Sequence, residues 1–152
     1  MSEELLRGVV FRLANVSNDF PPDSPQLQPI HVALSDRDKE IARKKGLPPT
    51  LSVFDRALCS VAQSKVIRPN DKRAIAFGFS VPDILAVQMP GLPALRVWRV
   101  PLDPPESELP GAAGHCGIEG LDRQEGLPNG KQLFRALRAK LAERSFRLAE
   151  QD

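Results

Sequence analysis

The chain has 152 residues, of which 41% are hydrophobic and 26% charged, a composition that supports a single folded domain over residues 1–152 and excludes wholesale disorder. Its 21 basic and 19 acidic residues nearly cancel, which argues against a dedicated nucleic-acid or membrane-surface protein. The chain has only two cysteines and an acidic start at Glu3 and Glu4, which predicts a protein of the reducing cytoplasm. No apolar run has the length of a membrane span, so we expect no membrane segment.

The first third of the chain alternates short apolar runs with breaks in which many of the 15 prolines lie. Leu5 to Leu13 is rich in β-branched residues and predicts a strand. The polar segment 15–29 predicts a long loop, and Ile30 to Leu34 has the length of a short strand. Asp36 to Lys45 predicts a helix, because a serine stands at its N-cap, acids occupy its first turn, bases its last, and a glycine follows.

The middle of the chain is less clearly patterned. Leu51 to Ile67 fits either one helix or a strand that leads into a helix, and we favour a helix for Ala57 to Lys65. Ala74 to Phe79 suits a strand or a single helical turn. Two apolar runs, Ile84 to Met89 and Leu95 to Val100, are separated by five residues that contain two prolines and a glycine, and they predict an antiparallel hairpin.

Residues 101–128 have little periodicity and many turn residues, so they predict a second long loop. A C-terminal helix is expected over about 130–149, and specifically from Lys131 to Ala149, because this stretch contains neither proline nor glycine. Its apolar face would consist of Leu133, Phe134, Leu137, Leu141 and Leu148. Together these elements predict an α+β fold: a small antiparallel or mixed sheet packed against a long C-terminal amphipathic helix, with long Pro-rich loops.

The adjacent pair His115 and Cys116 is the candidate catalytic site, since a thiolate beside an imidazole is a nucleophile. Neighbouring side chains on an extended strand point apart, so His31, the only other histidine, is a second candidate base. A tight turn with a half-buried thiol is the simpler interpretation and is favoured. The few His and Cys residues show no paired ligand spacing, and no phosphate-loop or dinucleotide motif occurs, so we expect no metal and no cofactor.

A second group of candidates concerns recognition. The 101–128 segment is acidic and the last helix is basic, so either these segments lie together or each meets a partner of opposite charge. Trp98, the single tryptophan, is a core anchor or an interface hot spot, and core is favoured. The candidate interaction residues are Glu106, Glu108, Glu119, Asp122, Trp98, Arg135 and Arg138.

These observations favour a non-enzymatic protein–protein interaction protein: an adaptor, accessory subunit or immunity-type partner in a larger complex. Its partner would be a protein whose identity the sequence does not reveal. One alternative is a Cys-dependent hydrolase or transferase centred on Cys116 with His115 or His31. A further alternative is a nucleic-acid-binding domain that uses the basic C-terminal helix. Whether the chain is an enzyme stays open, with the absence of a recognisable motif favouring a binding role.

Overall fold

The structure is a computed structural model that describes residues 3–17, 20–69, 73–122 and 126–149. Within these residues the chain forms one seven-stranded antiparallel sheet with the strand order β1-β5-β6-β3-β2-β4-β7. In chain order the strands are β1 (Glu4–Leu5), β2 (Val9–Ala14), β3 (Thr50–Asp55), β4 (Ile75–Ser80), β5 (Arg96–Arg99), β6 (His115–Glu119) and β7 (Phe146–Arg147). The fold is α+β, as the sequence predicts, but the sheet is larger than the small sheet expected.

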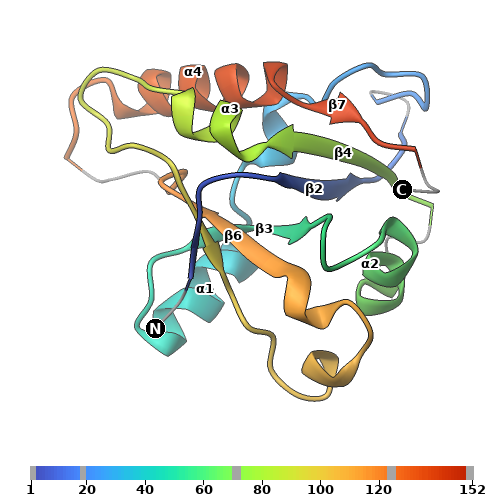
Figure 1. Ribbon diagram of the computed structural model, residues 1–152. Helices are drawn as coiled ribbons and strands as arrows, with labels where there is room; N and C mark the ends of the chain where they lie inside the picture. Colours follow the sequence, from blue (N-terminus) through green and yellow to red (C-terminus); the bar gives the residue numbers. More distant parts are fainter. Residues whose placement is uncertain (1–2, 18–19, 70–72, 123–125, 150–152) are drawn as a thin grey trace.

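The connections carry short helices. The α-helices described are α1 (Asp36–Lys45), α2 (Val61–Ile67), α3 (Val81–Ala86) and α4 (Gly130–Glu143), and the 3-10 turns are η1 (Pro29–Val32), η3 (Glu106–Glu108) and η4 (Ala112–Gly114). Figure 1 shows α3 and α4 together beside β4, whereas α1 lies at the opposite end of the view, next to β3 and β6. Helices therefore lie on both sides of the sheet.

The period-two alternation of the strands divides the core into two clusters, one on each face of the sheet. The larger cluster packs the sheet against α3 and α4, and includes Val10, Val53, Phe79, Ile118, Ile84, Phe134, Leu137 and Leu141. The smaller cluster lies on the opposite face with α2, and includes Phe11, Phe54, Cys59, Val61 and Ile67. Both clusters hold side chains that are almost wholly buried. The second face is only partly filled by its cluster, and its remaining part carries the groove described below.

Helix α1 is the element that the sequence predicts most accurately. The Ser35 hydroxyl accepts a hydrogen bond from the Asp38 backbone N–H at 3.1 Å, and the Asp38 carboxylate accepts one from the Ser35 N–H at 3.3 Å. This capping box fixes the start of the helix. Gly46 ends it with φ +67°, a left-handed conformation that glycine adopts at little cost. The expected range, Asp36 to Lys45, is confirmed.

Two predicted elements take another form, and the bounds of a third differ. Ile30 to Leu34 is not a strand, because Pro29–Val32 form a 3-10 turn against α4. In the first arm of the predicted hairpin, residues 84–86 belong to helix α3, whose first turn contains Pro82, and residues 87–89 have no regular structure. Of the second arm, Arg96–Arg99 is a strand. The ambiguous segment from Leu51 is a strand that leads into a helix, one of the two alternatives, but the helix is Val61–Ile67, capped by Ser60, and not Ala57 to Lys65.

The two proline-rich segments and the C-terminal helix also differ from expectation. Segment 101–128, of which residues 123–125 lie outside the described part, contains β6, paired on both sides inside the sheet. Residues 18–19 of segment 15–29 also lie outside the described part. The segment ends at Pro29, which is the first residue of η1. Helix α4 ends at Glu143, short of Ala149. Just beyond it the buried Ser145 hydroxyl donates to the Ala142 carbonyl and accepts the Leu27 N–H, and Phe146–Arg147 then pair with β4.

Candidate functional site

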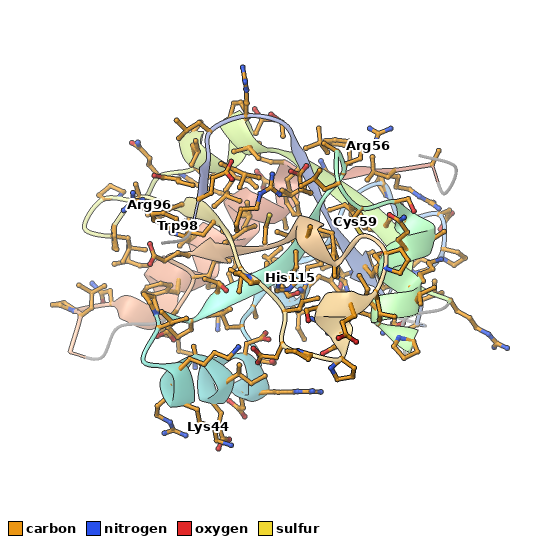
Figure 2. The ribbon with its side chains drawn as sticks, turned by 60° about the horizontal axis from the view of Figure 1, so that its bottom comes forward. Lys44, Arg56, Cys59, Arg96, Trp98 and His115 are labelled. Carbon is orange, nitrogen blue, oxygen red and sulfur yellow. The ribbon has the colours of Figure 1, made fainter. Side chains whose placement is uncertain are left out.

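A groove of about 1230 Å³ lies between α1 and the second face of the sheet. Alternate residues of β3 and β6 line its floor, and residues of α1, η1 and the segment after β5 line its walls. Figure 2 shows His115 near the centre of the molecule above α1, Trp98 on the side of β5, and Lys44 projecting from α1 away from the body. The volume exceeds the roughly 300–1000 Å³ of typical small-molecule pockets and leaves room for a segment of polypeptide.

The groove reaches a place where β2 and β3 separate. The two strands share only two residue pairs, at Val10 and Phe11 of β2, although β2 runs on to Ala14. Beyond these pairs, the Arg12 guanidinium links the diverging strands: Nη1 donates to the Ser52 carbonyl and Nε to the His31 carbonyl, both at 2.7 Å. A side chain thus connects the strands where main-chain pairing has stopped, and both diverging ends line the groove.

Exposed apolar side chains surround the groove. Ile30 of η1 is 74% exposed, Ile41 of α1 is 43% exposed, and Leu47 in the following turn is 56% exposed. All three line the same groove. A single exposed leucine needs no explanation, but large apolar side chains from three segments around one concave surface are typical of an interaction site.

The charges along the groove are balanced and partly paired. The Lys45 ammonium lies 2.8 Å from the Asp103 carboxylate, and the Arg68 guanidinium lies 2.7 Å from that of Glu106. These acids of the 101–128 segment therefore meet bases of α1 and of the residue after α2, and not bases of the C-terminal helix. Because both signs line the groove, it has no strong preference for a charged ligand of one sign.

His115 is held at the floor of the groove by two hydrogen bonds. Its Nδ1 lies 2.7 Å from the Val100 carbonyl, and its Nε2 lies 2.7 Å from the Ser52 hydroxyl. A carbonyl only accepts, so Nδ1 carries the ring proton and Nε2 accepts the Ser52 O–H. Burial lowers the pKa of His115 to about 4; the Val100 bond opposes this, and the Arg68 charge reinforces it. The imidazole is therefore neutral at pH 7.

The proposed pairing of Cys116 with its neighbour does not form. Cys116 belongs to the core on the α4 side of the sheet and is 0% exposed, while His115 faces the groove. Burial raises the pKa of the Cys116 thiol to about 11, although the nearby Arg99 opposes this shift. A buried thiol that stays protonated at neutral pH is neither a nucleophile nor accessible to substrate, so Cys116 has no part in the site.

His31, the other candidate base, also lines the groove but through η1. Its Nδ1 accepts the Gln28 backbone N–H at 3.0 Å, and its ring centroid lies 4.2 Å from that of Phe20. Burial is the main cause that lowers the pKa of His31. These contacts give His31 a role in closing the turn against the sheet.

The candidate interaction residues divide between the groove and other surfaces. Trp98, Glu119 and Glu106 line the groove. Trp98 is half-buried rather than a core anchor: its Nε1 lies 3.4 Å from the Glu119 carboxylate, and the Arg96 guanidinium lies 4.5 Å from its ring centroid. Glu108, Asp122, Arg135 and Arg138 do not line it.

Several basic residues of α4 and β7 have neighbours within the chain. Burial lowers the pKa of Arg138, and the adjacent charge of Arg135 acts in the same direction. Lys140 lies 3.4 Å from the Gln88 carbonyl, and the Arg147 guanidinium donates to the Pro22 carbonyl. Lys140 and Arg147 therefore contact the main chain of neighbouring loops.

Sequence reasoning missed Ser52, Arg12 and the three exposed apolar residues. A signal for Ser52 was present, because the polar Thr50 and Ser52 alternate with the apolar Leu51 and Val53 in the manner of a strand with one polar face. The position of Arg12 had no such signal, since its role depends on the separation of two strands that are distant in sequence.

The chain matches no known protein family, no curated protein and no solved structure. Over the part of the chain that is described, no helix has the length and apolarity to cross a membrane. Within the same residues, no three His, Cys, Asp or Glu side chains come together in a way that could hold a metal ion. The geometry of the groove is therefore the basis for a functional assignment.

Proposed function

We propose that this protein is a protein–protein interaction module, an adaptor or accessory subunit, that takes an extended segment of a protein partner into the groove beside α1. The observation that carries the proposal is the groove of about 1230 Å³ with Ile30, Ile41 and Leu47 exposed along it. Apolar anchors in a concave surface supply most of the binding energy in interfaces of this kind.

The other lining residues suit a peptide. The half-buried indole of Trp98 lines the groove, with the Arg96 guanidinium over its ring, and tryptophan is enriched among residues that dominate binding energy. The internal pairs Lys45–Asp103 and Arg68–Glu106 neutralise part of the charge along the groove walls. Apolar contacts rather than charge should then dominate, and affinity should fall only modestly as salt rises. A nucleic-acid ligand would instead produce a steep dependence on salt.

The experiment compares substitutions of exposed apolar residues by aspartate inside and outside the groove. Ile30→Asp and Leu47→Asp introduce a charge among the exposed apolar residues, whereas Val66→Asp places the same charge at a position that is 61% exposed and does not line the groove. All three should fold, since exposed substitutions rarely cost more than about 0.5 kcal/mol.

The readout is a native pull-down with quantitative mass spectrometry. We expect one protein to be retained by the wild type and by Val66→Asp and to be depleted at least tenfold with each groove variant, which corresponds to about 1.4 kcal/mol of binding free energy. Equal retention by all four forms would contradict the proposal, because binding would then occur elsewhere on the surface.

A further inference from the structure

A second feature of the groove is chemical and does not depend on a protein partner. Ser52 of β3 and His115 of β6 are diagonal neighbours on the same face, since Ser52 lies opposite Gly117 and His115 opposite Phe54. Diagonal pairs on an antiparallel sheet are within reach of long side chains. Here the Ser52 Oγ and the His115 Nε2 are 2.7 Å apart.

The hydrogen bonds of His115 set the direction of proton transfer. Because Nδ1–H donates to the Val100 carbonyl at 2.7 Å, the Nε2 lone pair points toward the Ser52 hydroxyl. A hydroxyl that donates to an imidazole, with the imidazole oriented by a third group, is the arrangement that activates a serine nucleophile. In this chain a backbone carbonyl occupies the place of the orienting group.

The surroundings allow a substrate to reach this pair. Ser52 is partly exposed and lines the groove, whereas His115 is 7% exposed and shielded from bulk water. The Arg12 guanidinium donates to the Ser52 carbonyl at 2.7 Å, which places a cation beside the nucleophile's own residue. The same guanidinium donates to the His31 carbonyl, so it holds the main chain of Ser52 in place beside the groove.

We propose that Ser52 is a nucleophile activated by His115, and that the groove catalyses acyl transfer from esters to water. The Ser52 oxygen would attack the carbonyl carbon of the ester while its proton passes to the Nε2 of His115. The C–O bond to the leaving alkoxide then breaks, and that alkoxide takes the proton from Nε2. Water attacks the acyl-serine, gives a proton to Nε2, and releases the carboxylic acid as Ser52 regains its proton.

The rate should be modest. His115 accepts a proton less readily than an exposed imidazole because burial lowers its pKa to about 4. Esters with a good leaving group need the least assistance from the acid form of His115, so an activated ester is the appropriate first substrate.

The test uses a fluorophosphonate probe and p-nitrophenyl acetate with the purified full chain. We expect the probe to attach to Ser52 of the wild type, as identified by mass spectrometry of the modified peptide. Ester hydrolysis should be lost in Ser52→Ala and should fall by about 10²-fold or more in His115→Gln. Ser107→Ala, which alters an exposed serine outside the groove, should hydrolyse the ester at the wild-type rate.

Labelling of the unmodified wild type decides the question even if a variant folds poorly. An unlabelled wild type, a label on a residue other than Ser52, or hydrolysis that persists in folded Ser52→Ala would overturn the proposal. Both reagents are small and need no partner, so this result is independent of whether the groove binds a protein segment.

Discussion

Acidification should destabilise this protein through His115 specifically. In the unfolded chain His115 has its ordinary pKa of 6.5, whereas in the folded protein burial lowers the pKa to about 4. Between these values the unfolded state binds a proton that the folded state does not. The free energy of unfolding therefore falls as the pH decreases from 6.5 to about 4.

The size of the effect follows from the two pKa values. Proton linkage between pH 7 and pH 4 gives a loss of roughly 3 kcal/mol for a group with these pKa values. That is a large part of the total stability of a domain of ordinary size, which is about 5–15 kcal/mol. The burial of His115, at 7% exposed, justifies the full figure, because little solvent screens the charge.

Urea denaturation at a series of pH values, with His115→Gln as the matched control, measures this contribution. Carboxylates and His31 titrate in both forms, so their contributions cancel in the difference between the two proteins. The free energy of unfolding of the wild type should fall by roughly 3 kcal/mol more than that of His115→Gln between pH 7 and pH 4. Parallel curves for the two proteins would refute the reasoning.

Three further outcomes follow from the packing. Leu137→Asp should lower the free energy of unfolding by roughly 3–5 kcal/mol, because a side chain that is 1% exposed against the sheet would become a buried charge. An unchanged melting temperature would mean that α4 does not pack there. Gly117→Ala should cost roughly 1–3 kcal/mol or more, since its Cβ would lie 2.2 Å from the Thr50 Oγ1, and Thr50→Gly in the same chain should recover part of that loss. Cys59 and Cys116 are free and buried, and burial raises the pKa of each thiol to about 11. A thiol reagent should therefore detect no thiol at first contact with the native protein at neutral pH, and two after unfolding without a reductant. A rapid reaction in the native protein would contradict their burial.

The elements that the sequence predicts well are those determined by local interactions. Helix α1 is specified by a serine cap, by charges that complement the helix dipole and by a terminal glycine, all within about a dozen residues. By contrast, α4 has no glycine or proline at its end. Beyond Glu143 the chain makes contacts that are distant in sequence, since Ser145 accepts the Leu27 N–H and Phe146–Arg147 pair with β4, and no local pattern contains those contacts.

Strand β6 shows the same limit more clearly. His115–Glu119 contains a glycine and little β-branched content, so its intrinsic preference for a strand is weak. It becomes a strand because β3 and β5 pair with it on both sides. Helix α3 is the converse case: the six apolar-rich residues Val81–Ala86 are too few for a helical period to be distinguished from a strand.

The candidate site was predictable only in part. His115 is a candidate from its chemistry, and the sequence already indicates that the adjacent Cys116 would point away from it on a strand, as the structure shows. Ser52 lies sixty-three positions from His115 and becomes its neighbour only through the register of β3 with β6. Registers between strands that are distant in sequence depend on tertiary packing, which explains why this pair was missed.

Site-specific photo-crosslinking tests the central claim, that the groove beside α1 is the surface that binds a partner. A photoreactive amino acid is placed at Leu47, which lines the groove, or at Val66, which does not, with both side chains largely exposed in the wild type. We expect irradiation of cells to join one protein partner to the chain through position 47, with the adduct on a single peptide segment, and to give no such adduct from position 66. Crosslinks of equal yield to the same partner from both positions, or from position 66 alone, would contradict the assignment of the groove as the binding site.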